Sequence, residues 1–473
     1  MTCTPAEIVD LRTDLDADLD SVLPEGVVRQ HGVPPCPPQD FQDNYTLPVH
    51  SVKPLQLLHT HPLDADLVFF EGPHIYTDRG VPTSGSVTAL AHAYQKPFVP
   101  QNAIDAMKGS RSQMWPRLDY VLDARLIQST EDIVPERGVL IVCGGKTVSV
   151  VQPYSMENGI DGTSILNLLR LTRKQTPGSE ETDGDEVYTF ERVMMDEEIK
   201  EMWMRNGTLA SHTGTEAHYM CELFLNGLPC RWWEPEMQIL FSFIREHMLP
   251  RNIIIWNTEK EIVCRDADIG GSIDAILYDA DANVHHILDF KRSDKLAGDM
   301  HNAWGGRGSK MESPMSHLDD CRGASYSLQL GIYQFILERD YGFNIGDRIL
   351  LSIHPDKPFM SSVPYLRAEV DYIMRKQFAL VLARKAAMQT NPEKFTCCFT
   401  NAPANEAVRL TDGRIAMEKA AILRQVDYEP AVSVRTEFAA KVKELMSDVS
   451  PPATEECILW KRRISKEGAV PFV

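Results

Sequence analysis

The chain has 473 residues, 43% of them hydrophobic, and a formal net charge of −19. This length is enough for two or three domains, and this hydrophobic content is enough for a buried core. Ten cysteines with a single adjacent pair exclude a disulfide framework and a CxxC zinc site, and no apolar run approaches the length of a membrane span.

Acidic residues are concentrated in two stretches. Residues 1–60 contain nine acidic and three basic residues, and residues 177–202 contain ten and two, so these stretches carry −14 of the net charge. The aspartates between residues 10 and 20 argue against an Arg-rich transit peptide, and a signal-peptide core is missing. The sequence therefore predicts a nuclear or cytosolic protein, with a mitochondrial location less favoured.

The first part of the chain alternates between tail-like and hairpin-like sequence. The acidic, proline-bearing residues 1–60 are typical of a disordered tail. Residues 69–94 predict a short hairpin that runs into a helix capped by Ser86 or Thr88. Residues 138–152 predict a second hairpin around Gly144-Gly145. A helix over 165–175, an acidic loop over 177–186 and a helix over 197–207 follow.

Residues 214–227, GTEAHYMCELFLNG, predict a further helix that ends at Gly227. His218 and Glu222 are four residues apart, so they share one face of this helix. The sequence TEKEIV at 258–263 then predicts a strand that places Glu261 beside the following hairpin.

That hairpin, residues 270–291, carries the most informative pattern, GGSIDAILYDADANVHHILDFK. Two apolar runs flank a turn-like sequence, and a turn centred after residue 281 places Asp274 opposite Asp289. Facing residues have Cβ atoms about 5 Å apart, where like charges repel each other. The commonest reason to keep such a pair is a divalent cation bound by carboxylate oxygens.

Lys291 follows Asp289 by two residues, so strand alternation points it to the same face. Two carboxylates and an ammonium around one metal are an arrangement for phosphodiester hydrolysis. The alternative is a pair of solvated edge residues. Against it, Asp289 lies within an apolar run, where an unpaired carboxylate is unfavourable.

Downstream, residues 326–342 predict a helix with Gln329 and Tyr333 four residues apart on one face. Residues 347–355 predict a central strand, and residues 370–388 predict an amphipathic helix.

The order of these motifs resembles the PD-(D/E)XK nuclease superfamily, specifically its RecB-like branch with the mitochondrial genome-maintenance exonucleases and their viral relatives. The likeness covers residues 67–120 and 200–386. The branch carries G-x-x-H, G-x-x-D, D-x-K and Q-x-x-x-Y elements and an SVT element that opens a helix. These are similar to Gly214–His218 (with one extra residue), Gly271–Asp274, Asp289–Lys291, Gln329–Tyr333 and Ser86–Thr88.

The chain departs from the branch in three ways. Residues 121–199 are a long insertion, and Arg292 stands where threonine is common. Cys397, Cys398 and Cys457 lack the spacing of iron–sulfur ligands, so we expect no iron–sulfur cluster.

The resemblance implies an α/β fold, a restriction-endonuclease-like central mixed β-sheet of four or five strands flanked by helices. It divides the chain into an acidic tail (1–60), the first part of a nuclease domain (61–120), the insertion (121–199), the nuclease core (200–388) and a C-terminal tail of unassigned role (389–473).

The resemblance also implies a role for each motif residue. Asp274, Asp289 and the Phe290 carbonyl would bind Mg²⁺ or Mn²⁺, and protonated Lys291 would orient the attacking water and stabilise the developing oxyanion. His218 would supply a further metal ligand.

The remaining residues would act around this centre. Glu222 and Glu261 are candidates for outer-sphere or second-metal roles. Gln329 and Tyr333 would contact the scissile strand or orient Lys291, with simple helix packing as the alternative.

The function implied is a metal-dependent deoxyribonuclease that acts on single-stranded DNA or DNA ends. The alternative is a catalytically inactive module used for DNA binding or assembly, which the complete set of motif residues disfavours. A net charge of −19 opposes contact with phosphates. Residues 301–390, however, contain eleven basic and nine acidic residues, and we expect the acidic stretches to lie outside the groove.

Overall fold

The computed structural model describes residues 54–109, 120–129, 140–143, 146–150, 185–228, 230–231, 233–300, 309–404, 406–430 and 441–450. The chain divides into two compact units, Pro97–Thr208 and the combination of Met1–Lys96 with Leu209–Val473. The expectations for residues 1–53, for the helix over 165–175, for most of the acidic loop and for Cys457 lie outside the described residues.

The unit Pro97–Thr208 contains a four-stranded antiparallel sheet in the order β7-β6-β5-β8. The predicted hairpin around Gly144-Gly145 is confirmed, since β6 and β7 pair on either side of it. A small core joins Ile104, Tyr120 and Ile199. The elements are α6 (Pro100–Lys108), β5 (Val121–Ser129), β6 (Leu140–Cys143), β7 (Lys146–Val150), β8 (Asp185–Val193) and the start of α8 (Asp196–Leu225).

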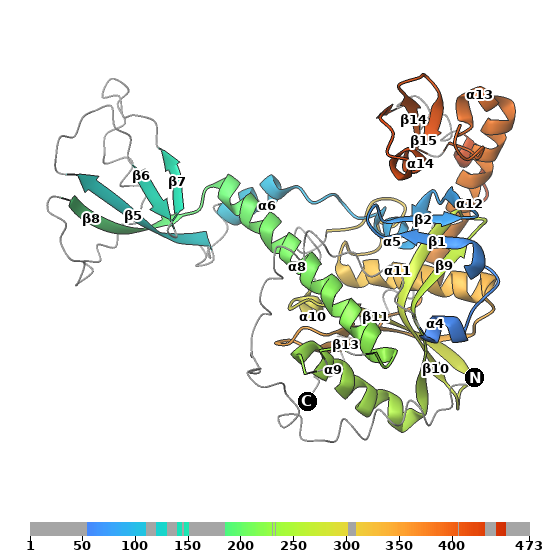
Figure 1. Cartoon of the computed structure of the whole chain (residues 1–473), viewed down its shortest axis with the longest axis horizontal. Coiled ribbons are helices and arrows are strands. Elements are labelled where there is room, and N and C mark those ends of the chain that lie inside the picture. Colours follow the sequence, from blue (N-terminus) through green and yellow to red (C-terminus); the bar gives the residue numbers. More distant parts are fainter. Residues whose placement is uncertain are drawn as a thin grey trace. The chain divides into compact units, whose positions relative to one another are not determined.

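The larger unit is built around a mixed six-stranded sheet, in the order β13-β12-β11-β10-β4 with β9 on the other edge of β10 (Figure 1). The pairs β11–β12 and β4–β10 are parallel and the rest antiparallel. The strands are β4 (Gly85–Ser86), β9 (Ile253–Cys264), β10 (Ile269–Asp279), β11 (Val284–Lys291), β12 (Ile345–Ser352) and β13 (Phe359–Ser362).

The expected number of four or five strands is therefore too low. The short strands β4 and β13 have two and four residues, too few to show an alternating pattern in the sequence. The predicted central strand is confirmed as β12, which pairs on both sides.

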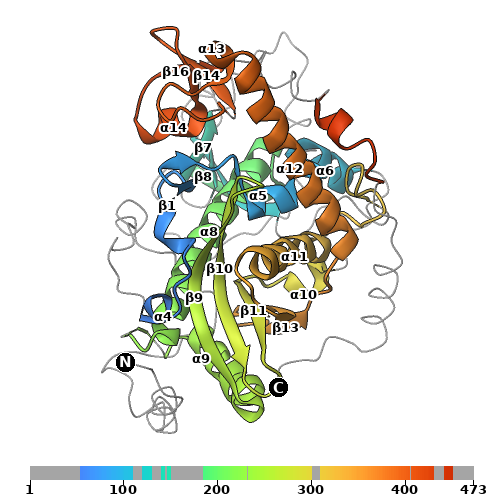
Figure 2. The ribbon, with the colours of Figure 1, turned by 90° about the vertical axis from the view of Figure 1, so that its right-hand side faces the viewer.

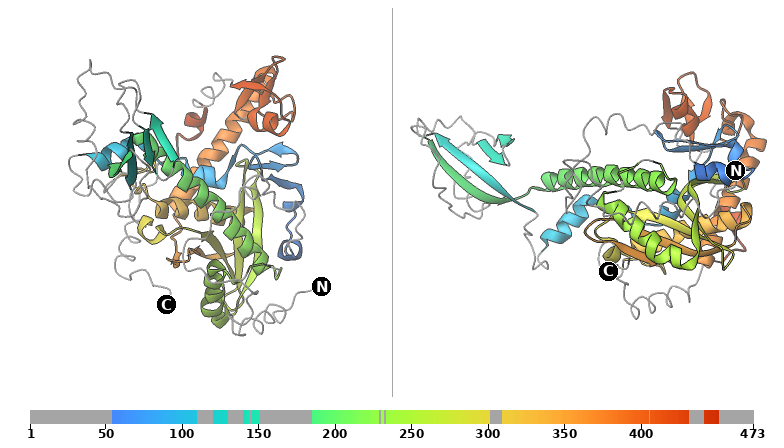
Figure 3. Two further views of the ribbon diagram at one scale, coloured as in Figure 1. Left: turned by 60° about the vertical axis from the view of Figure 1, so that its left-hand side comes forward. Right: turned by 60° about the horizontal axis from the view of Figure 1, so that its bottom comes forward.

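Helices cover both faces of this sheet (Figure 2). One core packs α5, α11 and α12 against Ile276 and Leu350, and the other packs α8 and α9 against Leu277 and Leu351. Figure 3 gives two further views of this arrangement. The predicted α/β class, with a central mixed sheet flanked by helices, is confirmed. The helices are α5 (Val87–His92), α9 (Pro235–Phe243), α11 (Arg322–Asp340) and α12 (Arg367–Thr390).

Helix α8 corrects one prediction. The sequence suggests two helices, over 197–207 and 214–227, but the chain forms one 30-residue helix through Gly207 and Gly214. A glycine inside a helix is unfavourable by only about 1 kcal/mol relative to alanine, which the packed apolar face outweighs. The predicted stop is confirmed, since Gly227 has φ 66° and follows the last helical turn.

The described chain before β4 begins with a helix. Residues 54–58, which the sequence analysis included in the tail, form α4 (Pro54–Leu58) with Leu55 buried. The Ser86 hydroxyl accepts from the Ala89 amide at 3.2 Å, so Ser86 is the cap of α5. A small antiparallel sheet precedes it, made of β1 (Leu67–Phe70), β2 (Ile75–Asp78) and β3 (Val81–Pro82).

Residues 391–430, within the predicted C-terminal tail, fold around a core of their own that includes Cys397, Val408 and Met417. The elements are three to six residues long, too short for periodicity to predict them. They are α13 (Pro392–Phe395), β14 (Ala407–Leu410), β15 (Ile415–Met417), α14 (Glu418–Leu423) and β16 (Tyr428–Pro430).

Short helical turns complete the described chain: η2 (Asp64–Asp66), η5 (Ile244–Met248), η6 (Leu249–Arg251) and α10 (Leu296–Asp299). Among the described helices, none has the length and apolar character needed to cross a bilayer.

Candidate functional site

The hairpin pairs as the sequence predicts. Asp279 faces Val284 across the turn, and Ala275 faces Leu288 in the last pair of the register. The next positions in this register are Asp274 and Asp289. Beyond them the same edge of β10 pairs with β4 at residues 269–270. The two aspartates therefore lie where β11 leaves β10.

Asp274 is held by two neighbours. Its Oδ2 accepts a hydrogen bond from the Phe290 amide at 2.6 Å and lies 3.4 Å from His218 Nδ1. Burial favours the neutral acid, but His218, Lys291 and the Phe290 amide outweigh it, so the pKa of Asp274 is lowered. Burial likewise opposes the imidazolium, yet Asp274 outweighs it and raises the pKa of His218.

Glu259 of β9 is a third acidic residue in this row, and the sequence analysis did not identify it. The β9–β10 register pairs Lys260 with Ile273 and Thr258 with Ala275, which places Glu259 opposite Asp274. Its φ is 43°, a left-handed conformation that a glutamate adopts rarely. Gln56 supports this irregularity by donating to the carbonyl oxygens of Thr258 and Glu259.

His218, Glu259 and Asp274 form a compact triad. One ligand atom from each lies within 4.8 Å of the others, and all three residues are partly buried. Ser272 donates to Glu259 Oε2 at 3.0 Å and so orients this carboxylate. Two carboxylates and an imidazole are a ligand set for a divalent cation, and the imidazole favours a transition metal such as Mn²⁺ over Mg²⁺.

Asp289 completes the row on the side of β11. Its Oδ2 forms an ion pair with Lys291, whose Nζ lies 2.5 Å away. Burial favours the neutral acid and Lys291 opposes it; with the added repulsion of Asp274, the pKa of Asp289 rises to about 6.

Lys291 remains protonated. Burial acts against its charge, but Asp289 and Asp274 outweigh it and raise the pKa of Lys291 above the ordinary value. The site therefore combines carboxylate and imidazole ligands with a fixed ammonium group, which can stabilise negative charge beside a bound cation.

Helix α11 brings Gln329 and Tyr333 to the same region. Gln329 Nε2 donates to the Tyr333 hydroxyl at 3.4 Å. Burial, with smaller contributions from Asp289 and Asp274, raises the pKa of Tyr333, so its hydroxyl keeps its proton. The ring lies against Gly271, where an added Cβ would be 2.8 Å from Cε1.

The remaining candidates take different places. Glu222 is buried on α8, one turn after His218, and Glu261 lies opposite Ser272 on β9; both are outside the triad. Phe290 is buried and contributes its amide to Asp274, while its ring contacts His218 edge to face at 6.0 Å. Gly214 has open space where a Cβ would be, so no packing contact requires this motif glycine.

Arg292, the residue that departs from the family pattern, forms a buried ion pair. Its Nε donates to Glu236 Oε1 at 3.0 Å, and both side chains are 6% exposed. Its Nη1 donates to Thr213 Oγ1 at 3.4 Å. Arg292 thereby fixes the end of β11 to α8 and α9, next to Lys291.

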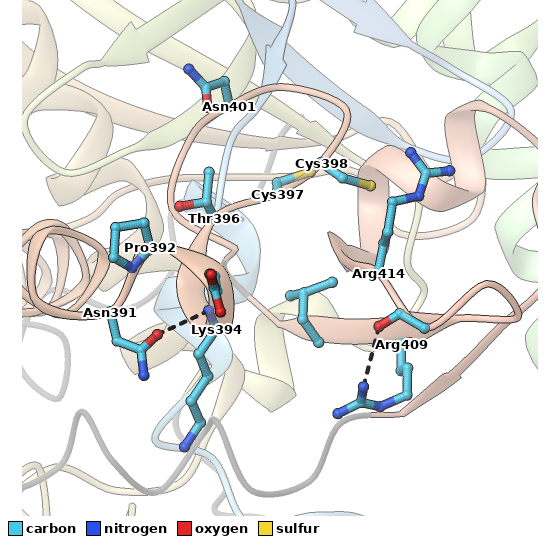
Figure 4. Close-up of a pocket in the computed structure, with 12 residues that line it drawn as sticks. Asn391, Pro392, Lys394, Thr396, Cys397, Cys398, Asn401, Arg409 and Arg414 are labelled. Carbon is cyan, nitrogen blue, oxygen red and sulfur yellow. Dashed lines mark hydrogen bonds between the residues drawn. The ribbon is translucent and has the colours of Figure 1, made fainter.

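A cavity of about 660 Å³ lies elsewhere, in the C-terminal segment (Figure 4). Lys394, Arg409 and Arg414 line it, and Glu393 is the one carboxylate in its lining. It is lined by neither a carboxylate pair nor a histidine.

No family model matches this chain, and neither a curated protein nor a solved structure resembles it significantly.

Proposed function

We propose that this protein is a divalent-cation-dependent nuclease that hydrolyses phosphodiester bonds in DNA. One observation carries the proposal: the strand registers, extended by one residue, bring Glu259, Asp274 and Asp289 into one row across three adjacent strands, with the Lys291 ammonium 2.5 Å from Asp289. Like charges brought together in this way are unfavourable without a cation between them.

The ligands follow from this geometry. Asp274, Glu259 and His218 would hold a cation at the triad, and Asp289 would add a carboxylate from the facing strand. A bound divalent ion supplies Lewis acidity and lowers the pKa of a coordinated water. His218 must lose a proton to bind a metal, so binding would release protons.

Lys291 would act as a fixed positive charge. Because the carboxylates keep it protonated, it serves poorly as a base and well as a hydrogen-bond donor. It would orient the attacking water and stabilise the negative charge that develops on the phosphoryl oxygens. Tyr333 and Gln329 would support this arrangement, since the protonated Tyr333 hydroxyl can donate to the substrate strand.

The proposed mode of cleavage and the proposed metal rest on the resemblance of the motifs to the RecB-like branch. It favours an exonuclease that acts on single strands or ends and uses Mg²⁺ or Mn²⁺. The imidazole in the triad favours Mn²⁺.

The test is cleavage of end-labelled single-stranded DNA, duplex DNA and closed circles by the purified protein with Mg²⁺, with Mn²⁺ or with a chelator. We expect metal-dependent loss of linear substrates. Shortening from an end indicates exonuclease action, and cleavage of circles indicates endonuclease action.

Two variants distinguish cleavage at this site from cleavage by a contaminating nuclease. Asp289→Asn should lower cleavage by at least about a hundredfold, because it removes a carboxylate from the metal site. Asp281→Asn is the matched control, an exposed aspartate in the turn of the same hairpin, and should cleave like the wild type. Equal cleavage by the two variants, or cleavage in the chelator, contradicts the proposal.

A further inference from the structure

Lys291 contacts a second group besides Asp289. Its Nζ lies 5.1 Å from the centre of the Tyr326 ring on α11. Arg322, one turn earlier on the same helix, donates from Nη1 to the Tyr326 hydroxyl at 3.3 Å. A guanidinium and an ammonium therefore meet on one buried tyrosine, although like charges repel each other.

A third basic group faces the same place. His92, the last residue of α5, lies within the electrostatic reach of both cations: partial desolvation of its ring, together with Lys291 and Arg322, lowers its pKa. Helix α11 begins at Arg322, and the amides of its first turn add partial positive charge. The cations Lys291 of β11 and Arg322 of α11 thus converge beside the acidic row, next to the neutral imidazole of His92.

The chemistry of this cluster selects an anion. A guanidinium is a planar donor that matches the oxygens of a phosphate, and a tyrosine hydroxyl that accepts from it fixes its orientation. Lys291 links the cluster to Asp289, so an anion at Arg322 lies next to the position of the scissile phosphate. A polynucleotide supplies such neighbouring phosphates along one strand.

We propose that Arg322, oriented by Tyr326, binds a backbone phosphodiester adjacent to the one that is cleaved. This subsite rests on the proposed function of the neighbouring acidic row. Arg322 is a substrate-binding residue here, and Tyr326 is a positioning residue.

A purely structural role has a different signature. The pair Arg322–Tyr326 is an i,i+4 contact at the start of α11, which could serve only to stabilise the first turn. Such a contact changes thermal stability and leaves the salt dependence of DNA binding unchanged. A phosphate contact changes that salt dependence, because each neutralised phosphate releases counterions.

The test is binding of a fluorescent single-stranded oligonucleotide to the full chain in a chelator, measured by anisotropy over a range of salt concentrations. Arg322→Gln should weaken binding about tenfold at low salt, as expected for one charged hydrogen-bonded contact. The slope of log affinity against log salt should become shallower by about 0.7, the value for one phosphate of a single strand. Tyr326→Phe, which retains the ring beside Lys291, should weaken binding by a smaller factor.

The control is Arg251→Gln, which removes an exposed arginine of η6 at the other end of the sheet. It should bind like the wild type. Equal affinity and slope for Arg322→Gln and Arg251→Gln overturn the subsite, as does a wild-type protein that does not bind the oligonucleotide.

Oligonucleotides with a single neutral methylphosphonate identify the source of the phosphate. One internal linkage should weaken binding by the wild type and have no effect on Arg322→Gln. Sensitivity confined to a terminal phosphate contradicts an internal contact. Failure of the proposed function appears separately, as missing cleavage by a protein whose binding still depends on Arg322.

Discussion

Gly271 of β10 and Tyr333 of α11 fit together without spare space. A Cβ on Gly271 would lie 2.8 Å from Tyr333 Cε1 and 3.0 Å from Val87 Cγ2. The motif glycine therefore has a packing role, because it admits the tyrosine ring beside the acidic row. Gly270 does the same for Tyr76, with an added Cβ 2.6 Å from the ring.

Gly271→Ala should therefore destabilise the protein by roughly 1–3 kcal/mol, the usual effect of overpacking a core. It should also displace Tyr333 and lower cleavage. Gly207→Ala is the matched control, because nothing lies within 4 Å of its added Cβ inside helix α8. That change should stabilise by about 0.5–1 kcal/mol. Thermal unfolding measures both, and a neutral Gly271→Ala contradicts the tight fit.

Glu259 and Glu261 offer a comparison within one strand. Glu259→Gln should weaken Mn²⁺ binding by at least about tenfold, because it removes a charged ligand from the triad. Glu261→Gln should leave Mn²⁺ binding unchanged, since Glu261 lies outside the triad. Isothermal calorimetry measures both affinities. The reverse order would assign the metal to Glu261, as the sequence analysis suggested.

The metal-free protein should lose stability as pH rises from 5 to 8. Asp289 has a folded pKa of about 6 against an ordinary value of 3.8, so its contribution is complete below about 4 and is lost as pH rises through 6. The raised pKa of His218 also makes the metal-free protein less stable as pH rises above 6.5. The lowered pKa of Asp274 makes the protein more stable as pH rises, but this effect is confined to pH values below 3.8.

Melting temperatures in a chelator measure this trend. Asp289→Asn and His218→Gln should each flatten the profile between pH 5 and 8. Metal affinity should move in the other direction and increase with pH, because both groups must release protons to bind a cation. A wild-type profile that rises over this range would contradict the assigned pKa shifts.

The Arg292–Glu236 ion pair should act on stability and leave turnover unaffected. Arg292→Met leaves Glu236 buried without a counter-charge and should destabilise by roughly 3–5 kcal/mol. The double variant Arg292→Met/Glu236→Leu should recover most of this loss, because both charges are removed together. Chemical denaturation measures stability. A fall in turnover by the folded fraction of the double variant would instead place Arg292 in the active site.

The sequence predicts the hairpin well because its information is local. Alternating apolar residues and a turn-forming sequence determine the register between β10 and β11, and this register places Asp274 opposite Asp289. The triad is harder to predict. Glu259 enters it through a left-handed backbone in β9, supported by Gln56 about 200 residues earlier in the chain, and no local pattern reports that contact.

Other differences between the sequence-based predictions and the structure also have specific causes. Gly207 suggested a helix end, but tertiary packing continues α8 through it. Arg322 precedes the Gln-x-x-x-Tyr motif and showed no pattern, because its role depends on Lys291 reaching the same tyrosine from another element. The short elements of residues 391–430 are stabilised by their shared core, which periodicity does not reveal.

The three carboxylates of the row come from consecutive strands, between Glu259 and Asp289. Contacts this close in sequence form early in folding, because little loop entropy is lost. We therefore expect mutual repulsion of the acids to oppose a pairing that forms early in folding. A divalent cation or a proton would relieve it at that moment, so the ion proposed for catalysis would also accelerate the folding of the strands that hold it.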